Sequence, residues 1–461
     1  MFSVIVACDS QFGIGNEKNE IPWKSKKDMK FFRDMTKDSV VIMGGNTFRS
    51  LKKPLKGRDM LIISHTLMEP KECTTNNIIK VFRDPMTCVR FCMKKYKNIK
   101  IFICGGKTIY DWFHANRLIN CVYLTSVYGD FGCSVFYDYY KFKLDNDYKK
   151  ELIIKYDAFN EEPRLEIYKY QFINKEELNM LDLMHDVINN GNKRMDRTSI
   201  GTLSLFGKQF RFDLTNNTFP LMTTRPVFLR GVFEELMLFI RGQTDTTILE
   251  SKNINIWKGN TSREFLDKQG LHHLSIGDMG HSYGFSFRHF GANYINSQTD
   301  YKNKGYDQLK NVIDEIKNNP TGRRHIISLW EPNNLHKTPL PPCLFLYQFY
   351  IADDNLSCMM TQRSSDFGVA GGWNVATGAL LTILIANICK LKPYELIWNI
   401  GDVHIYNNIL SNTLEQLKRQ PNIYPKLFIN NKPIDIELFE FENLELINYK
   451  PLDKIDFVMN I

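Results

Sequence analysis

The chain has 461 residues, 43% of them hydrophobic and 13% aromatic, which is ample material for large cores. At about 150 residues per domain, this length predicts two to four domains. The net charge of +8 comes from 59 basic and 51 acidic residues without a dense basic run, which suits anionic ligands and disfavours nucleic acid as the main partner.

Targeting and metal signals are missing from the sequence. The ten cysteines form no Cys-x-x-Cys, and no histidine cluster accompanies them at zinc spacing, so we expect no metal site. Free thiols in a long chain favour a reducing, cytoplasmic location. The N-terminus reads directly as a strand without a signal peptide. The most apolar helix, at about 379–391, is interrupted by polar residues and is too short to span a bilayer, so no membrane partner is expected.

The first 172 residues alternate between short apolar runs and helical segments. Strands are expected over 4–7, 40–43, 61–63, 101–104 and 122–125, and helices over 26–36, 85–97 and 107–115. Strand–helix alternation predicts an α/β, doubly wound and mainly parallel sheet. Residues 152–157 and 165–172 could close this sheet as an antiparallel hairpin.

A short junction separates this part from the next. Asn174 can cap a helix that contains Glu177 three residues later, which is a capping-box pattern. We therefore place the boundary near 173–175 and expect two domains, 1–173 and 174–461. No repeat or low-complexity segment interrupts them.

The second part has an α+β pattern. Helices are expected over 176–190, 227–242, 306–318, 373–391 and 407–419, and strands over 199–213, 324–330, 344–352 and 356–363. The last two strands flank Asp353-Asp354-Asn355 and read as a hairpin.

The strongest functional signal is Pro341-Pro342-Cys343, followed about twenty residues later by Gln362-Arg363-Ser364-Ser365-Asp366 and then by Asn374. Two prolines place the thiol on a stiff turn. The arginine can hold the thiol as the nucleophilic thiolate and can also clamp a phosphate. A lone cysteine would more often be a buried loop residue. In combination, these groups predict a covalent enzyme that acts on a nucleotide.

This arrangement resembles the thymidylate synthase family, and further matches run over about residues 176–461. They are Asp196-Arg197-Thr198, Gly201-Thr202, Phe219-Pro220-Leu221, Glu234-Glu235-Leu236, Ile256-Trp257, Tyr283-Gly284-Phe285, Arg288-His289-Phe290-Gly291, Arg323-Arg324 and Asp402-Val403-His404-Ile405-Tyr406.

The first 172 residues are similar to dihydrofolate reductases. The matching motifs are Ile14-Gly15-Asn16, Ile21-Pro22-Trp23, Asp28-Met29-Lys30-Phe31-Phe32, Val41-Ile42-Met43-Gly44, Thr47-Phe48, Pro54-Leu55-Lys56-Gly57-Arg58 and Cys104-Gly105-Gly106. The whole chain thus resembles the bifunctional dihydrofolate reductase–thymidylate synthases. The resemblance implies a dihydrofolate-reductase-like sheet followed by a thymidylate-synthase-like α+β fold.

The resemblance implies that the N-terminal part reduces dihydrofolate with NADPH. Asp28 would hold the pteridine ring and support its protonation, although an acid in a first helical turn can also serve only the helix dipole. The other expected folate contacts are Phe32, Leu51, Arg58, Cys104 and Thr125, of which Arg58 would clamp the α-carboxylate.

The expected NADPH site rests on Gly105-Gly106, which would let the backbone approach a pyrophosphate. The full set implied is Ala7, Ile14, Gly15, Gly44, Thr47, Ser64, Gly105, Gly106, Thr108 and Tyr110. Gly45 and His65 stand where relatives often carry cations that meet the phosphates of NADPH. The preference for NADPH over NADH therefore stays open at the level of sequence.

The resemblance implies that the C-terminal part makes dTMP from dUMP with 5,10-methylenetetrahydrofolate. Cys343 would attack C6 of the uracil, and Glu235 and Tyr283 would manage protons. The expected dUMP contacts are Arg197, Arg363, Ser364, Asn374, His404 and Tyr406, with Arg323 and Arg324 supplied by a partner subunit. Ile256, Trp257 and Asp366 would meet the folate. A homodimer joined through the second domain is therefore expected.

Three departures from the synthase pattern stand out. Leu344 follows the cysteine where the family usually has histidine, Ala370 replaces a glycine, and Gly371-Gly372-Trp373 replaces Val-Pro-Phe. Two glycines would loosen a loop that leads into Asn374. We expect an active synthase with altered folate affinity or rate. The alternatives are an enzyme with only one live activity, most plausibly the reductase, and an RNA-binding regulator, which salt-dependent RNA binding would reveal.

Overall fold

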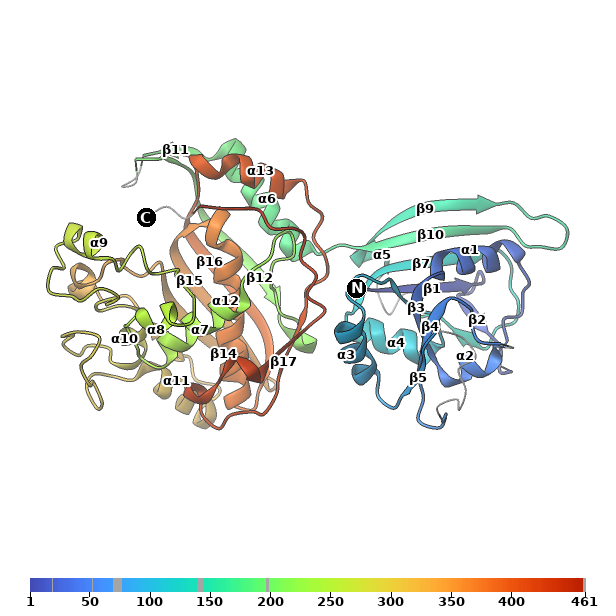
Figure 1. The fold of residues 1–461 in the computed structure, drawn as a ribbon, viewed down its shortest axis with the longest axis horizontal. Coiled ribbons are helices and arrows are strands. Elements are labelled where there is room, and N and C mark those ends of the chain that lie inside the picture. Colours follow the sequence, from blue (N-terminus) through green and yellow to red (C-terminus); the bar gives the residue numbers. More distant parts are fainter. Residues whose placement is uncertain (19, 52, 69–76, 139–143, 196–198, 459–461) are drawn as a thin grey trace. The chain divides into compact units, whose positions relative to one another are not determined.

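The computed structural model describes residues 1–18, 20–51, 53–68, 77–138, 144–195 and 199–458. Contacts within the chain divide it into two compact units, Met1–Asn174 and Lys175–Ile461. Each unit has its own sheet, with helices packed against it (Figure 1).

The N-terminal unit is built on an eight-stranded mixed sheet. Its strand order is β5 (Ile79–Phe82), β4 (Arg58–Ile63), β3 (Ser39–Gly44), β6 (Ile101–Ile103), β1 (Phe2–Cys8), β7 (Ile119–Val127), β10 (Leu165–Phe172) and β9 (Tyr148–Tyr156). The neighbours pair in parallel up to β7, and β10 and β9 close the sheet antiparallel. The predicted doubly wound sheet and its hairpin are confirmed. Strand β5 was not expected, because four residues at a sheet edge are too short for a clear alternation.

The helices of this unit are α1 (Lys26–Thr36), α2 (Gly45–Ser50), α3 (Pro85–Lys95), α4 (Lys107–Ala115) and α5 (Leu144–Asp147). Two of them, α1 and α3, begin at a side-chain cap. The hydroxyl of Ser25 caps α1 by accepting the N–H of Asp28 at 3.2 Å. The short strands β2 (Gly13–Gly15) and β8 (Val135–Phe136) form a separate two-stranded antiparallel sheet. The cap fixes Asp28 in the first turn of α1.

The C-terminal unit has a six-stranded sheet in the order β11 (Asn192–Arg194), β12 (Thr202–Asp213), β16 (Lys392–Tyr406), β15 (Asn355–Asp366), β14 (Leu344–Ala352) and β13 (Ile326–Ser328). Only β15 and β16 pair in parallel. Its helices are α6 (Lys175–Asn190), α7 (Leu229–Ile240), α8 (Thr247–Glu250), α9 (Arg263–Lys268), α10 (Tyr283–Arg288), α11 (Gln308–Asn318), α12 (Phe367–Ile388) and α13 (Leu410–Leu417), and β17 (Lys426–Ile429) pairs with β18 (Leu444–Ile447). The α+β class is confirmed.

Strand β16 was missed by the sequence reading although it is central in the sheet. Leu396, Trp398 and Ile400 are buried at even positions, whereas Val403 and Ile405 are buried at odd ones. The alternation therefore changes phase at Gly401, and no single period-two run marks the strand. A Cβ at Gly401 would lie 2.6 Å from the carbonyl oxygen of Arg363, so glycine lets β16 approach β15 at this point.

Helix α12 corrects two expectations. It begins at Phe367 rather than at 373, because the carboxylate of Asp366 caps it by accepting the N–H of Val369 at 3.2 Å. Gly371 and Gly372 therefore lie inside a helix and do not form a loop into Asn374. With 22 residues the helix is also long and apolar enough to cross a membrane, but 78% of its most apolar window is buried in the fold.

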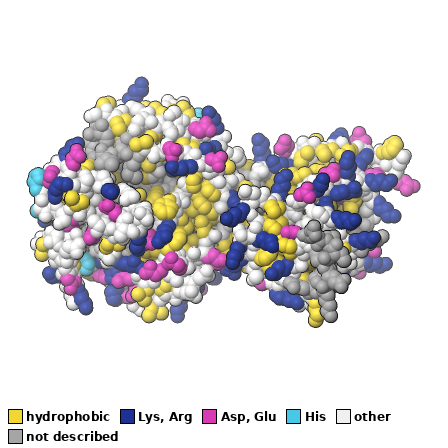
Figure 2. All heavy atoms as spheres, viewed as in Figure 1, with side chains coloured by type: hydrophobic (Ala, Val, Ile, Leu, Met, Phe, Trp, Pro, Cys, Tyr) yellow, Lys and Arg dark blue, Asp and Glu magenta, His cyan; other side chains and the backbone are white. Residues whose placement is uncertain are grey.

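The surface of the C-terminal unit carries a strip of hydrophobic side chains down the face shown in Figure 2. Beneath the surface, α12 packs on β15, β16 and α7. Its apolar residues point in all directions, as is typical of a helix enclosed by its own domain. The start of this enclosed helix forms part of the wall of a cavity in this unit.

Candidate active sites

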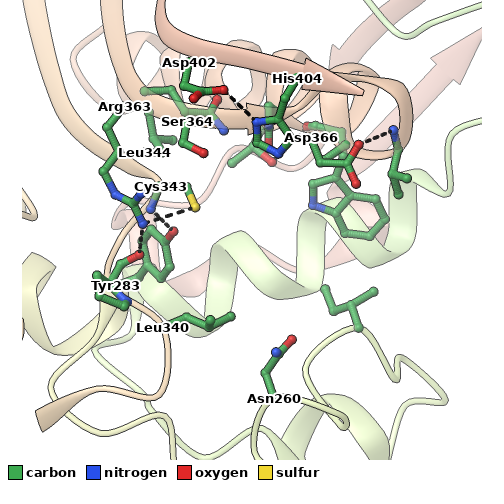
Figure 3. Close-up of a pocket in the computed structure, with 18 of the residues that line it drawn as sticks. Asn260, Tyr283, Leu340, Cys343, Leu344, Arg363, Ser364, Asp366, Asp402 and His404 are labelled. Atoms are coloured by element: carbon green, nitrogen blue, oxygen red, sulfur yellow. Dashed lines mark hydrogen bonds and ion pairs between the residues drawn. The ribbon is translucent and has the colours of Figure 1, made fainter. Parts of the chain in front are cut away.

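A cavity of about 790 Å³ opens in the C-terminal unit. Its wall combines the junctions before β14 and after β15, the first turns of α12, one face of α7 and the end of β16. Figure 3 shows the Arg363 guanidinium turned toward Cys343 and Tyr283, with Asp402 and His404 on the neighbouring strand. The cavity thus collects a thiol, a guanidinium, carboxylates and an imidazole.

The register of two strands places Cys343 beside Arg363. Leu344 pairs with Gln362 across β14 and β15, and the Arg363 N–H donates to the Cys343 carbonyl at 2.8 Å. The guanidinium donates to the carbonyls of Pro342 at 2.9 Å and Pro341 at 2.8 Å, which brings its Nη2 to 3.7 Å from the Cys343 sulfur. The Cys343 N–H donates to the Tyr283 hydroxyl at 2.8 Å. A cation fixed in this way stabilises a thiolate.

Glu235 on α7 is the most enclosed acid of the cavity wall. Its side chain accepts a hydrogen bond from the indole of Trp257 at 2.8 Å and another from the indole of Trp373 at 2.7 Å. Burial raises the pKa of Glu235, and the two indole donors oppose that rise. Burial also raises the pKa of the neighbouring Tyr283, so that phenol stays protonated in the free enzyme.

Polar groups gather where β16 ends and α12 begins. The ring Nδ1 of His404 lies 3.0 Å from Asp402, whose other oxygen is 2.5 Å from Arg194. Burial raises the pKa of Asp366 to about 6. The side-chain NH₂ of Asn374 donates to the Ser365 hydroxyl at 3.4 Å, and the side-chain oxygen of Asn374 can accept a hydrogen bond from a ligand. These groups can read a polar heterocycle and a sugar hydroxyl.

A second cavity, of about 700 Å³, lies in the N-terminal unit. It is bounded by α1 and by the segments that follow the carboxyl ends of β1, β3, β4 and β6, the usual ligand position in a doubly wound sheet. Asp28 lines it, with a hydrogen bond to the side chain of Thr125. Burial raises the pKa of Asp28, and the hydrogen bond to Thr125 lowers it to a smaller extent.

Two glycine pairs, Gly44-Gly45 and Gly105-Gly106, line this cavity. Gly105 has φ +124°, and a Cβ there would lie 3.3 Å from the Thr47 hydroxyl oxygen. The Gly44 N–H donates to the Gly105 carbonyl at 2.7 Å, so the two backbone segments meet directly. The Tyr110 hydroxyl donates to the carbonyl of Ile5 at 2.9 Å and ties α4 to β1. Glycine is required for this close passage of backbone along the cavity.

Comparison with known proteins agrees with both cavities. Residues 1–171 match the dihydrofolate reductase family, and residues 178–461 match the thymidylate synthase family. The chain is 37% identical to the bifunctional dihydrofolate reductase-thymidylate synthase of Paramecium tetraurelia, over all of this chain and 99% of that protein. The proteins of the same name from Zea mays and Leishmania major are 35% and 36% identical, over 97% and 95% of their lengths.

The chain belongs to the bifunctional dihydrofolate reductase–thymidylate synthase family. It is therefore a bifunctional enzyme, with dihydrofolate reductase activity in the N-terminal unit and thymidylate synthase activity in the C-terminal unit. The reading of the sequence as this family is confirmed.

Most of the residues expected at the synthase site line the synthase cavity. They are Glu235, Ile256, Trp257, Tyr283, Cys343, Arg363, Ser364, Asp366, Asn374, His404 and Tyr406. Arg323 and Arg324 do not line it: both are exposed at the turn before β13. Arg197 lies outside the described residues. Leu344, the replacement for histidine, is buried in the cavity wall.

At the reductase site, the cavity wall includes Asp28, Phe32, Leu51, Cys104, Thr125 and all ten residues expected for NADPH: Ala7, Ile14, Gly15, Gly44, Thr47, Ser64, Gly105, Gly106, Thr108 and Tyr110. Arg58 is not in this wall. It is buried at the start of β4, where its guanidinium donates to Thr36, the Lys56 carbonyl and the Arg33 carbonyl at 2.6–2.9 Å. Two of its five N–H groups remain for another acceptor.

Arg49 and Trp373 are among the wall residues to which the sequence analysis assigned no role. Arg49 reaches the reductase cavity from α2, and Trp373 was noted only as a departure from the synthase pattern. For Arg49 a signal existed: it lies four residues after Gly45, hence on the same face of a helix. For Trp373 the sequence held no signal, because its partner Glu235 is 138 residues away.

Proposed function

We propose that the synthase cavity converts dUMP to dTMP with 5,10-methylenetetrahydrofolate, and that the reductase cavity returns the resulting dihydrofolate to tetrahydrofolate with NADPH. The observation that carries the proposal is the Cys343 thiol held 3.7 Å from the Arg363 guanidinium in a cavity that also contains Glu235 and Asn374. The test is a spectrophotometric assay of both reactions on the purified protein. Turnover of only one substrate set would support the single-activity alternative, and RNA binding without any turnover would support a regulator.

In the synthase site, the Cys343 thiolate forms a bond to C6 of the uracil, and C5 becomes the nucleophile that takes up the one-carbon unit. Arg363 stabilises the thiolate and binds the phosphate of dUMP. The Asn374 amide can donate to a uracil carbonyl and accept from N3–H. Glu235 transfers the proton at the oxygen of the C4 carbonyl, and Tyr283 supports removal of the proton from C5. Ser364, His404 and Tyr406 hold the phosphate and the deoxyribose.

The folate end of the same cavity is assigned to Ile256, Trp257 and Asp366. An indole and an aliphatic side chain offer a flat apolar surface to a pterin ring, and the carboxylate offers acceptors to its ring N–H groups. Asp366 also caps α12, so its position is fixed by the helix before any ligand binds.

In the reductase site, NADPH supplies a hydride when it is bound. A Cβ at Gly105 or Gly106 would lie 3.3 Å from the Thr47 hydroxyl oxygen, so a side chain there would crowd the cavity wall. Without side chains, the two glycines let the backbone approach the pyrophosphate of a dinucleotide. Asp28 and Thr125 hold the pteridine and its proton, Phe32 and Leu51 line the benzoyl group, and Arg58 uses its remaining donors on the α-carboxylate.

Arg49 is our candidate for the phosphate-binding cation that Gly45 and His65 do not supply. A Cβ at Gly45 would lie 2.6 Å from the Ser64 hydroxyl oxygen, so no larger side chain fits there without a shift. The Arg49 guanidinium lies 3.9 Å from that Cβ position and donates to Asn46 and Thr66, both at 2.9 Å. We assign to Arg49 the role of the missing cation at the phosphate end of the cofactor site.

Replacing Arg49 by glutamine is expected to weaken NADPH binding about tenfold and to change NADH binding little. A charge-assisted hydrogen bond contributes about 1.5–3 kcal/mol, and exposure of this site to solvent reduces that figure. Fluorescence titration of both cofactors at several salt concentrations measures the difference. Arg90→Gln is the matched control, since Arg90 is exposed on α3 outside the cavity wall. An equal loss for both cofactors would contradict the assignment.

Arg323 and Arg324 are assigned to the phosphate site of a second copy of the chain. Both side chains are exposed and absent from the wall of their own cavity, as a role in a partner's site requires. The enzyme would then be a homodimer through the synthase units.

The free thiols of the described residues fit the expected cytoplasmic location.

Mixing inactive Cys343→Ala with inactive Arg324→Ala under conditions of subunit exchange is expected to restore synthase activity. A hybrid dimer carries both defects in one site and neither in the other, so random pairing returns about a quarter of wild-type activity. The measurement is dTMP formation per total protein, with each variant alone as control. Absence of recovery, despite exchange shown by a mass-tagged subunit, would mean that Arg324 acts within its own chain.

A further inference from the structure

The carboxylate of Glu235 is held from two sides by indole N–H groups. Trp257, in the segment after α8, donates to Oε1 at 2.8 Å, and Trp373, in the second turn of α12, donates to Oε2 at 2.7 Å. Each carboxylate oxygen therefore has its own donor, and the two donors come from elements far apart in the chain. Glu235 itself is 9% exposed, so solvent contributes little to its solvation.

Glycine on α7 creates the seat for the Trp373 indole. Gly231 lies one helical turn before Glu235, on the same face of the helix. A Cβ at Gly231 would lie 2.6 Å from Cη2 of Trp373 and 2.8 Å from the Phe228 ring. A Cβ at Gly372 lies only 3.2 Å from the Cβ of Met222, so there too the backbone has little spare room. The two helices can bring this indole to this carboxylate because Gly231 lacks a side chain.

Two phenols that interact electrostatically with the carboxylate are also neutral. They belong to Tyr283 and Tyr347, and burial raises the pKa of both phenols, so both stay uncharged near neutrality. The guanidinium of Arg363, which also lines the cavity, is directed to Cys343 and the prolyl carbonyls. The adjacent Glu234 pairs with Lys252 at 2.6 Å and Arg230 at 3.8 Å.

We propose that Trp373 is a positioning residue of the synthase reaction, whose indole N–H fixes the Glu235 carboxylate in place. This inference rests on the proton-handling role proposed above for Glu235. A neutral donor suits the task, because it stabilises the carboxylate without the attraction of a full positive charge, which would weaken Glu235 as a base. The tryptophan that replaces the family's phenylalanine thus adds a donor that phenylalanine cannot supply.

The pH dependence follows from the direction of the two effects on Glu235. Burial raises its pKa and each indole lowers it. Loss of one donor lets the pKa rise further, so a smaller fraction of the enzyme carries the ionised form near neutral pH. The acidic limb of the synthase profile therefore moves to higher pH when Trp373 loses its N–H.

The test is Trp373→Phe, which keeps an aromatic ring and removes the N–H. We expect the acidic limb of kcat for dTMP formation to move to higher pH by about one unit, which lowers kcat by up to about tenfold at pH values on that limb. KM for dUMP should change little, because Trp373 is assigned no contact with the nucleotide. Because the synthase is a compact unit of its own, its thermal melting curve checks that the variant has folded.

A second variant reaches the same contact without altering tryptophan. Gly231→Ala should push the indole away from Glu235 and raise the acidic limb in the same direction. The double variant should resemble Trp373→Phe alone, because phenylalanine no longer reaches the position of Cη2. Additive shifts in the double variant, or an unshifted limb in Trp373→Phe, would overturn the proposal.

Glu235→Gln separates failure of this inference from failure of the proposed function. If Glu235→Gln lowers kcat strongly and Trp373→Phe leaves the profile unshifted, Glu235 keeps its role and Trp373 loses the one proposed here. If Glu235→Gln retains full turnover, the role of Glu235 itself is wrong. Infrared difference spectra then still report whether Trp373→Phe changes the ionisation of this carboxyl, by the band that Glu235→Gln removes.

Discussion

Replacing Cys343 by alanine is expected to abolish dTMP formation and to leave NADPH oxidation with dihydrofolate intact. The variant loses the sulfur that forms the bond to C6, while Arg363 keeps its hydrogen bonds to the prolyl carbonyls. Without a covalent adduct, C5 of the uracil is not activated, and no neighbouring side chain of the cavity can replace the thiolate. Parallel assays of the two reactions on one preparation measure the effect.

Cys389→Ala is the matched control for this experiment. Cys389 is partly buried at the C-terminal end of α12, away from the cavity wall, and burial raises the pKa of its thiol to about 11. Its removal should leave both activities near wild type. Persistent dTMP formation by Cys343→Ala would show that another group is the nucleophile. An unchanged melting curve of the synthase unit excludes unfolding as the cause of any loss, and the reductase assay controls for the N-terminal unit.

Asp28→Asn is expected to lower reductase turnover at neutral pH by about 10²–10⁴-fold, the usual contribution of one well-placed proton-transfer group. The amide keeps the shape of the side chain and loses the group that supports protonation of the pteridine. Part of the rate should return at low pH, where the substrate is protonated from bulk solvent. Turnover across pH with dihydrofolate measures both effects, and an unchanged turnover number at pH 7 would refute the role of Asp28.

The same substitution should not destabilise the fold at neutral pH. The pKa of Asp28 is raised in the folded protein, so ionised Asp28 is less favourable there than in the unfolded chain. The stability that protonated Asp28 provides is fully present below the ordinary carboxyl pKa and is lost as pH rises through the raised value. Asparagine does not titrate, so the melting temperature of the variant at pH 7 should equal or exceed that of the wild type. A clear drop would point to a structural role for the carboxylate.

The sequence predicted the central pair of the synthase site because a hairpin carries it. Once 344–352 and 356–363 are read as paired strands, Cys343 and Arg363 must meet at the same end. The glycines of the reductase cavity were predictable for a similar reason, since they directly follow buried strands. A local sequence pattern of this kind predicts both the strand and the position of the functional group at its end.

Other parts of the sites depend on contacts that no local pattern records. Strand β16 changes its buried face at Gly401, so its alternation is not continuous. The cap that starts α12 at Phe367 is an aspartate that sequence reading had assigned only to ligand binding. The indole of Trp373 meets Glu235 only because Gly231 leaves room on another helix. Each depends on how two distant segments pack.

The enclosed helix α12 couples the packing of the core of the synthase unit to the geometry of its active site. The helix that fills the centre of the domain also carries Trp373 and Asn374 in its first turns, and Asp366 begins it. A cavity or an oversized side chain in the buried middle of α12 would tilt or slide those turns as a rigid rod. Selection on this helix therefore acts on folding and on substrate geometry at once, and core substitutions that a separate scaffold would absorb reach the uracil and the folate directly.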